Sequence, residues 1–357
     1  MYIPKLSLLL FILISSTAII DITEAQLKGK WPPKGPPPIN KAWNKLVKKK
    51  KLVNAPVITT QGDCSGNPID TCNWSCSHCN RPDDILACPT KNVWGLSFDD
   101  GPSEYTSALL DFLDENDVKA TFFLIGINVV GNPELVKRMV DSGHEVGVHT
   151  WSHTALTTQT TEQIIAEVKW TEKAIKEAGG ITPRLMRPPF GDMDDRVRGI
   201  MKQLGYKIVI WDKDSRDWVS VSDPTFQLEW VAGNFSVWAS EDTPTGHISL
   251  EHDYYQQTAE QGPKAVSTLL DAGWNINTVA NCSDFSPYLE NLKGGDETAA
   301  ASEVSLNNNA TANNNDNTTD PTVVTQSATN GSFTSKISTI SLVVSLSIIG
   351  ITMSYLL

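Results

Sequence analysis

The sequence predicts an α/β protein in which a mostly parallel sheet closes into a distorted barrel of seven strand–helix units. Between residues 93 and 278, seven short apolar runs alternate with segments of helical periodicity. This order is typical of parallel strands that are joined by helices. In addition, acidic, histidine and arginine side chains follow several of the apolar runs, at the end of the barrel where such folds carry their active sites.

The expected strands are short and apolar, and the expected helices carry ordinary start and stop signals. The strands are 93–98, 120–125, 145–149, 184–187, 207–211, 247–251 and 274–278. The helices are 103–115, 133–141, 160–178, 193–204, 223–239 and part of 257–272. Pro133 follows Asn132 at one helix start, Thr160 and Gln163 form a capping box at the next, and Gly205 lies beyond a third.

Both ends of the chain carry targeting signals. Residues 1–25 predict a secretory signal peptide, because Lys5 precedes an apolar run and Ala25 offers a cleavage point. Residues 331–357 predict a glycolipid-anchor (GPI) signal with attachment at Asn330, and a plain C-terminal membrane helix is the alternative. The chain is therefore expected to be secreted and held at the outer face of the plasma membrane, in the cell wall, or both.

The segments next to the signals are polar. Residues 26–61, rich in Pro and Lys, predict a flexible leader, with a processing site or a contact with an anionic wall polymer as the alternative. Residues 287–330 predict a disordered stalk rich in Asn, Ser and Thr. The formal net charge of −12 argues against a nucleic-acid partner. N-glycosylation sequons occur at Asn73, Asn234, Asn281, Asn309, Asn317 and Asn330.

The cysteines predict disulfides. A Cys-rich segment, 62–92, precedes the barrel domain, 93–286, and holds Cys64, Cys72, Cys76, Cys79 and Cys88. The sixth cysteine is Cys282. Zinc at Cys76 and Cys79, with His78 between them, is the alternative, but the oxidising compartment implied by the signal peptide favours disulfides. Because five cysteines cannot pair wholly among themselves, one of them is expected to bond Cys282.

Two adjacent carboxylates, Asp99 and Asp100, end the first apolar run. Neighbouring side chains on a strand point in opposite directions, so one can bind a metal while the other acts beside it as a base. The structural alternative is an Asx-type turn. His149 and His153 follow the third run at a spacing that lets both rings face one point on a turn of helix. With Asp100 they offer three ligands, which suit a catalytic zinc, although similar ligands also serve non-haem iron.

Three later stretches add candidate groups at strand ends. In the first stretch, 187–191, Arg187 can pair with a carboxylate in the mouth of the barrel. The alternative is a surface arginine in a rigid loop. The backbone amide of Phe190 can face a reacting oxygen. The second stretch is 214–218, and the third, residues 250–252, ends in His252, a candidate acid whose pKa a neighbouring carboxylate can raise.

These stretches, in this order, resemble the motifs of the polysaccharide deacetylase family (carbohydrate esterase family four). The matching segments are 97–102, 149–153, 187–190, 214–218 and 250–252, and the resemblance covers residues 93–279. One departure is Phe190, where the family usually has Tyr. The Cys-rich segment, the stalk and the anchor signal are most similar to fungal GPI-anchored chitin deacetylases.

The resemblance implies a metal site with a base beside it. Asp100, His149 and His153 would bind a divalent metal, usually zinc in the family, with cobalt as a substitute. Asp99 would be the general base that takes a proton from the attacking water, and Arg187 would hold Asp99 in place.

The resemblance also implies an acid and a pocket on the other side of the reacting amide. The backbone amide of Phe190, together with the metal, would stabilise the oxyanion. His252 would protonate the leaving amine, with Asp217 tuning it. Trp218 and Leu250 would surround the acetyl methyl group.

The implied activity is metal-dependent hydrolysis of N-acetyl groups in chitin, which gives chitosan and acetate, in the fungal cell wall. The expected partners are chitin or chito-oligosaccharides and, through the anchor, membrane lipid; the chain is expected to be a monomer. Two alternatives stay open. One is an acetyl-ester hydrolase on another acetylated glycan such as xylan, and the other is a non-catalytic wall glycan-binding protein, against which the full set of reactive residues argues.

Overall fold

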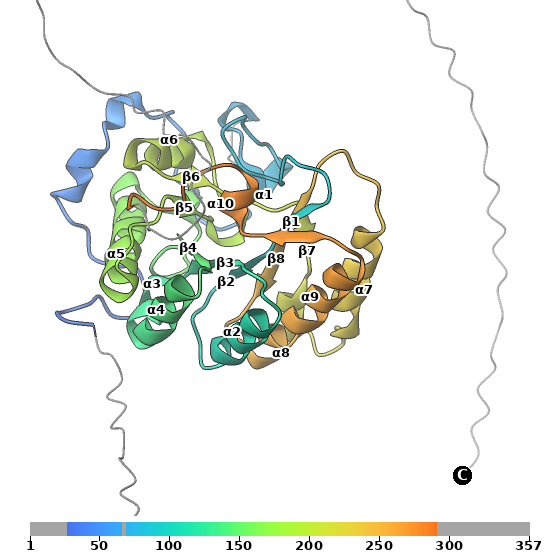
Figure 1. The fold of residues 1–357 in the computed structure, drawn as a ribbon. Coiled ribbons are helices and arrows are strands. Elements are labelled where there is room, and N and C mark those ends of the chain that lie inside the picture. Colours follow the sequence, from blue (N-terminus) through green and yellow to red (C-terminus); the bar gives the residue numbers. More distant parts are fainter. Residues whose placement is uncertain (1–26, 66–68, 291–357) are drawn as a thin grey trace, which may run out of the picture. The chain divides into compact units, whose positions relative to one another are not determined.

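The computed structural model describes residues 27–65 and 69–290 (Figure 1). The expected signal peptide, the anchor signal, Asn309, Asn317 and Asn330 therefore lie outside the described residues, as does the stalk beyond residue 290. Within the described ranges, no helix has both the length and the apolar character needed to cross a membrane.

The strands form a parallel barrel, as expected. They are β1 (Val93–Gly95), β2 (Ser97–Asp99), β3 (Thr121–Leu124), β4 (Glu145–Val148), β5 (Leu185–Met186), β6 (Lys207–Ile208), β7 (Lys213–Asp214), β8 (His247–His252) and β9 (Asn275–Asn277). Each of the seven expected runs contains or begins one of these strands. The first run is divided at Leu96 into β1 and β2. The fifth run begins with β6, and β7 follows shortly after its end.

The pairing of the strands closes the ring. From β2 the order runs through β3, β4 and β5 to β6, and every pair is parallel. The same stretch of chain then continues into β7, which pairs with β8, and β8 returns to β1 and β2. β9 pairs with the edge of β1 opposite to β8. The carboxyl ends of all these strands consequently share one end of the barrel.

The helices surround the strands (Figure 1). They are α1 (Trp74–Ser77), α2 (Thr106–Glu115), α3 (Gly126–Gly131), α4 (Pro133–Asp141), α5 (Thr161–Gly179), α6 (Asp195–Leu204), α7 (Glu229–Ala239), α8 (Gln256–Ala259), α9 (Gly262–Asp271) and α10 (Val279–Cys282). The capping box at Thr160 and Gln163 is confirmed. The buried apolar side chains form two clusters, and in the larger one Phe98 and Phe122 stack as register partners.

Several helix boundaries differ from the expectation for local reasons. α6 begins at Asp195 because the side chain of Asp194 accepts a hydrogen bond from Val197 N over 2.8 Å. Residues 223–228 are not helical, since Asp223 accepts from both the backbone and the hydroxyl of Thr225 in a tight turn. Helix α3 was not expected, because its sequence, GINVVG, is short and contains two glycines.

The expectation of a flexible leader is wrong for residues 27–61. Trp31 stacks on Trp151 at a centroid distance of 6.3 Å, and Trp43 packs edge-on against Trp170 of α5. The indoles of Trp151 and Trp170 donate to the carbonyls of Pro33 and Pro38. Composition alone suggested a solvated segment, but its widely spaced tryptophans bury enough apolar surface to fix it against the barrel.

The stalk boundary at residue 287 is also too early. Tyr288 is buried, and its hydroxyl accepts a hydrogen bond from Val146 N over 2.8 Å. Arg184 N donates to the carbonyl of Pro287 over 2.8 Å. Residues 287–290 are therefore part of the folded barrel domain.

All six cysteines form disulfides, which excludes the zinc alternative at Cys76 and Cys79. The pairs are Cys64–Cys76, Cys72–Cys79 and Cys88–Cys282. The expectation that one N-terminal cysteine bonds Cys282 is confirmed, and the partner is Cys88. This bond joins the segment before β1 to the segment after β9.

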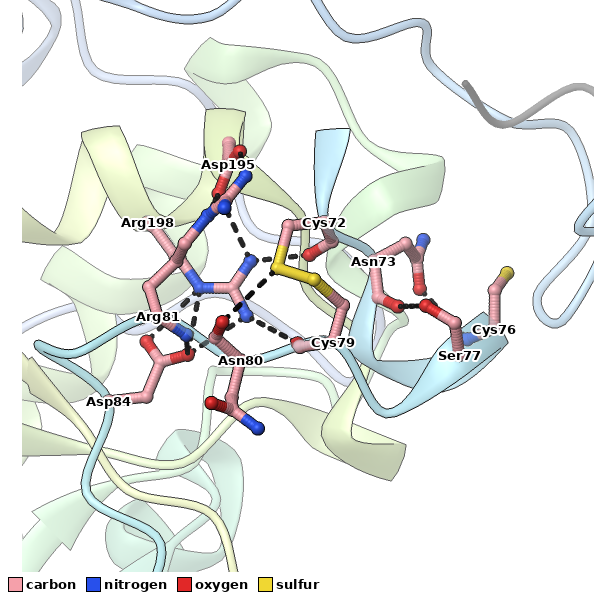
Figure 2. The surroundings of a disulfide bond; sticks show 10 residues. All are labelled: Cys72, Asn73, Cys76, Ser77, Cys79, Asn80, Arg81, Asp84, Asp195 and Arg198. Carbon is pink, nitrogen blue, oxygen red and sulfur yellow. Dashed lines mark hydrogen bonds and ion pairs between the residues drawn. A yellow bond between two sulfur atoms is a disulfide. The ribbon is translucent and has the colours of Figure 1, made fainter. Parts of the chain in front are cut away.

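An arginine of α6 holds the Cys-rich segment against the barrel (Figure 2). The guanidinium of Arg198 donates to the carbonyls of Cys72 and Cys79 and pairs with Asp84 and Asp195. Figure 2 shows Arg198 between these groups, beside the Cys72–Cys79 disulfide. The segment is thereby fixed to the helix that follows residues 187–191, a loop that carries candidate site residues.

Candidate metal centre and pocket

Asp100, His149 and His153 converge at the carboxyl end of the barrel. Asp100 Oδ1 lies 3.4 Å from His149 Nε2 and 3.2 Å from His153 Nε2. Zinc ligands stand about 2.0–2.2 Å from the ion at tetrahedral angles, which separates them from one another by about 3.3–3.5 Å. The same oxygen of Asp100 is buried without a hydrogen-bond partner. The three ligand atoms lie within 4.8 Å of one another and can therefore hold a metal ion, and the two separations from Asp100 match those expected around zinc.

The protonation states suit metal binding. Nδ1 of His149 lies 2.7 Å from the carbonyl of Arg187, which can only accept, so in the neutral tautomer Nδ1 carries the proton and Nε2 offers a lone pair. Burial lowers the pKa of His153 to about 4, so this ring is neutral at pH 7. Burial alone would raise the pKa of Asp100, but the neighbouring histidines hold it below its ordinary value.

The loop that carries the two histidines is not the helical turn expected from their spacing. Residues 149–153 have no regular structure, and Thr150 (φ 67°) and His153 (φ 57°) adopt left-handed backbone conformations. Such a conformation costs a residue other than glycine about 1–2 kcal/mol. The rings therefore converge through an irregular loop that other contacts must hold, and not through helical periodicity.

Asp99 lies beside the three ligands, at the end of β2. Its Oδ1 accepts a hydrogen bond from Arg187 Nη1 over 2.8 Å, and its Oδ2 lies 3.6 Å from His149 Nε2. Arg187 is fully buried and also donates to the carbonyl of Ile210. One carboxylate oxygen is thus held by the guanidinium while the other faces the ligand cluster. The surface-arginine alternative does not apply to Arg187.

His252 and Asp217 form a second pair at the end of β8. His252 Nδ1 lies 2.7 Å from Asp217 Oδ1, and His252 N donates to the other carboxylate oxygen over 2.9 Å. Burial would lower the pKa of His252, but the charge of the fully buried Asp217 outweighs it and raises the pKa to about 10. Because Nδ1 is bonded to Asp217, Nε2 is the nitrogen left for a substrate.

One pocket of about 530 Å³ is lined by Asp99, Asp100, His149, His153 and His252. Arg187 and Asp217 do not line it; they are buried and bond Asp99 and His252. Phe190 is about half exposed at its rim, has a left-handed backbone (φ 60°), and packs its ring against His153 at 4.5 Å. Trp218 and Leu250 also line the pocket. The structure therefore brings the metal-ligand, base, acid and wall residues of the sequence analysis together.

Three further lining residues were given no role from the sequence: Gln61, Trp211 and Asp214. Trp211 and Asp214 offered a signal, since they lie at or just beyond the end of an expected strand. Burial raises the pKa of Asp214. Gln61 offered none, because it belongs to the segment expected to be a flexible leader.

A smaller hollow of about 190 Å³ adjoins this pocket and shares Asp100 and His153 with it. Tyr254 and Tyr255 line the hollow and pack edge to face at 4.9 Å. Lys34, from the leader, is also part of its wall. Exposed aromatic side chains next to a polar cleft are suited to stacking on sugar rings.

The three sequons within the described residues differ in exposure. Asn281 is exposed and Asn234 is partly exposed on α7. Asn73 is only 4% exposed, and its side chain caps α1 by accepting from Cys76 N. A glycan bonds to the side-chain nitrogen, and because Nδ2 of Asn73 is buried, glycosylation there would require this side chain to move.

Comparisons with known proteins agree with this geometry. Residues 87–209 match the polysaccharide deacetylase family. The chain is 40% identical over 269 residues to chitin deacetylase 1 of Cryptococcus neoformans, which covers 69% of this chain and 57% of that protein. It is 36% identical over 231 residues to chitin deacetylase 2 of Saccharomyces cerevisiae. This match covers 64% of this chain and 70% of the yeast protein.

A solved structure is similar as well. The chitin deacetylase from the fungal pathogen Colletotrichum lindemuthianum superposes with a TM-score of 0.54 at 32% identity. The match covers 57% of this chain and 94% of that one. The chain thus spans nearly all of this structure, but little more than half of the Cryptococcus relative.

Proposed function

This chain belongs to the polysaccharide deacetylase family, and from that premise we propose that it is a metal-dependent chitin deacetylase. It hydrolyses the N-acetyl groups of N-acetylglucosamine residues in chitin or chito-oligosaccharides and releases acetate. One observation carries the proposal. Three metal-ligand side chains, a separately held carboxylate and a separately held imidazolium line one pocket. The named activities of the Cryptococcus and yeast relatives support the choice of substrate.

Asp100, His149 and His153 are the proposed ligands of the metal, which we take to be zinc, with cobalt able to replace it. When bound there, zinc lowers the pKa of water and polarises a carbonyl oxygen. Ligands of one carboxylate and two neutral imidazoles leave coordination positions open, as a catalytic zinc requires.

Asp99 is the proposed general base. The bond from Arg187 to Oδ1 fixes the carboxylate, so that Oδ2 is directed to the ligand cluster and can accept a proton from the attacking water. The backbone amide of Phe190, at the rim of the pocket, is the proposed donor to the oxyanion that forms on the acetyl carbonyl.

His252 is the proposed general acid. Its raised pKa keeps the ring protonated at neutral pH, and Nε2 can deliver the proton to the leaving amine. An amine is a poor leaving group until it is protonated, so an acid distinct from the base is useful. Trp218 and Leu250 are the proposed walls around the acetyl methyl group.

The adjoining hollow supports a polymeric substrate. Sugar residues on either side of the reacting one need surface next to the pocket, and the hollow with Lys34, Tyr254 and Tyr255 offers such a surface. We further propose secretion, a lipid anchor near Asn330 and a monomeric state. Three disulfides support the secreted compartment.

Acetate release from chitin oligomers and from acetylated xylan, measured with and without a chelator, tests the proposal. We expect activity on the oligomers, its loss on chelation, and its return with zinc or cobalt. Faster acetate release from xylan would indicate an acetyl-ester hydrolase instead of a chitin deacetylase. Absence of acetate release from both substrates would favour a non-catalytic glycan-binding protein. Release of the surface protein by a phosphatidylinositol-specific phospholipase tests the anchor.

A further inference from the structure

Glu167 is a buried carboxylate on α5 that none of the proposed chemical steps uses. The residue is 0% exposed. Its Oε2 accepts hydrogen bonds from Trp151 N over 2.8 Å and Ser152 N over 2.9 Å, and its Oε1 accepts from the Ser152 hydroxyl over 2.6 Å. All three donors belong to the irregular loop between His149 and His153. Glu167 therefore binds the middle of the loop that carries two of the three metal-ligand side chains.

The other backbone groups of this loop are bonded to different elements. His149 N donates to the carbonyl of Leu124, and the carbonyl of Thr150 accepts from Gly126 N, both over 2.9 Å. His153 N donates to the hydroxyl of Thr150 over 3.1 Å. The two ends of the loop are thus tied to β3, to α3 and to the loop itself, while the two amides at its centre depend on Glu167.

We propose that Glu167 is a positioning residue that fixes the His149–His153 loop in its metal-binding shape and so sets the affinity for the metal. The inference rests on the proposed metal site. Thr150 and His153 hold left-handed conformations that an unrestrained loop would leave. Without Glu167, two buried amides lose their acceptor, and the loop can recover hydrogen bonds only by changing shape, which moves the His153 ring away from Asp100.

Glu145 provides a matched control for this role. It is also buried, and it accepts hydrogen bonds from two consecutive amides, Ala280 N over 2.9 Å and Asn281 N over 3.3 Å. It accepts from the hydroxyls of Thr121 and Thr278 as well. Glu145 lies at the start of β4, at the opposite end of the strand from His149. Replacing either glutamate by alanine leaves two backbone amides without an acceptor. Only the two amides bound by Glu167 lie in the His149–His153 loop.

The test measures zinc affinity of the metal-free proteins by competition with a chromophoric chelator, together with thermal unfolding. We expect Glu167→Ala to raise the zinc Kd about 10- to 100-fold, the range typical of losing a partner that orients metal ligands. Glu145→Ala should lower the melting temperature comparably and change the Kd by less than about twofold. The absorption spectrum of the cobalt form should change in Glu167→Ala alone.

Glu167→Gln is the conservative variant. Its amide oxygen can accept from both backbone amides while its NH₂ group donates to the Ser152 hydroxyl, so zinc affinity should stay near that of the wild type. If Glu167→Ala does not fold, Glu167→Asp and Glu145→Asp replace the pair, since each withdraws the carboxylate by one methylene. A wild-type Kd in the Glu167 variant, or equal changes in both variants, overturns the inference. A wild-type chain that binds no zinc overturns the metal site, and this inference with it.

Discussion

Arg187 Nη1 donates to Asp99 Oδ1 over 2.8 Å in the interior of the barrel, where both side chains are almost fully buried. The pair fixes the carboxylate that we propose as the base without using it as a metal ligand. The base and the metal site should consequently respond separately to mutation.

Asp99→Asn should retain the metal and lose turnover, because the amide keeps a hydrogen-bond acceptor for Arg187 but cannot take a proton. We expect kcat to fall at least about 100-fold, the lower limit for loss of a general base. Zinc content by elemental analysis should stay at the wild-type level. Asp111→Asn, which changes an exposed carboxylate paired with Arg138, is the control and should keep its rate. An Asp99→Asn protein with near wild-type kcat would remove Asp99 from the mechanism.

Asp217→Asn should move the alkaline limit of activity toward neutral pH. The charge of Asp217 raises the pKa of His252, so removing that charge lets burial lower the pKa again. Because the protonated ring is the form that serves the leaving amine, activity is lost as pH rises through this pKa. The pH dependence of kcat/KM in the two proteins measures the shift.

His252→Ala is the companion measurement for the same pair. It should slow hydrolysis of the amide far more than that of an acetyl ester with a good leaving group, which needs little protonation. Equal losses on both substrates, or an unmoved alkaline limit in Asp217→Asn, would make His252 a structural residue.

Lys34→Ala should weaken binding of long oligomers more than that of short ones, because Lys34 lines the hollow beside the pocket and not the pocket itself. Loss of one hydrogen bond from a charged group at an exposed site is worth about 1 kcal/mol, or roughly a fivefold rise in KM. A series of chito-oligosaccharides of increasing length measures the effect. Lys41→Ala, also in the leader but outside both cavities, is the control. A rise in KM that is the same for short and long oligomers would mean that the hollow lined by Lys34 does not bind the substrate.

His144 should make stability fall as the solution is acidified. Its ring is buried and its Nδ1 accepts from Ala120 N over 3.2 Å. Burial lowers the pKa of the folded ring from 6.5 to about 4, so the unfolded chain binds the proton more tightly. The associated stability, about 3 kcal/mol, is present above pH 6.5 and is lost between pH 6.5 and 4.

Urea unfolding at pH 7, 5 and 4 measures this loss. His144→Asn, whose side-chain oxygen can still accept from Ala120 N, should flatten the pH dependence of the unfolding free energy in this window. The exposed His78 supplies the control variant His78→Asn. A His144→Asn protein with the wild-type slope would show that other groups cause the acid sensitivity.

Cys282→Ser should destabilise the protein more than removal of the Cys64–Cys76 bond. The lost bond spans a sequence separation of 194, against 12 for Cys64–Cys76. The chain-entropy model gives about 5 and about 3 kcal/mol for loops of these sizes. Thermal unfolding ranks the variants, and thiol titration should find Cys88 only after denaturation, because it is fully buried. A reversed ranking would mean that chain entropy does not dominate.

The sequence predicted the barrel because its strands are short apolar runs and its helices have clear caps, both of which are local signals. It also predicted that the candidate site residues after different strands would lie together, because parallel strands bring their carboxyl ends to one end of the barrel. It did not reveal that Asp99 and His252, far apart in the chain, are register partners on neighbouring strands. Strand order depends on the whole fold, and no local pattern encodes it.

Other parts of the site depend on tertiary contacts that composition conceals. The spacing of His149 and His153 suggested a helix, but the loop amides instead donate hydrogen bonds to Glu167, Leu124 and Thr150 and so hold an irregular loop. The leader looked solvated because prolines and lysines dominate it. A few tryptophans that pack on α5 decide its position, and with it the positions of Lys34 and Gln61.

The Cys88–Cys282 bond also changes how the domain would carry mechanical load. If the chain is pulled between residue 290 and its own N-terminal segment, tension that enters at residue 283 and leaves at residue 87 has a direct covalent path through the two sulfur atoms. The strands from β1 to β9, and the pocket at their ends, lie inside the covalent loop, so the covalent path through the sulfur atoms does not run through them. The bond thus gives tension along the chain a covalent route that bypasses the metal centre.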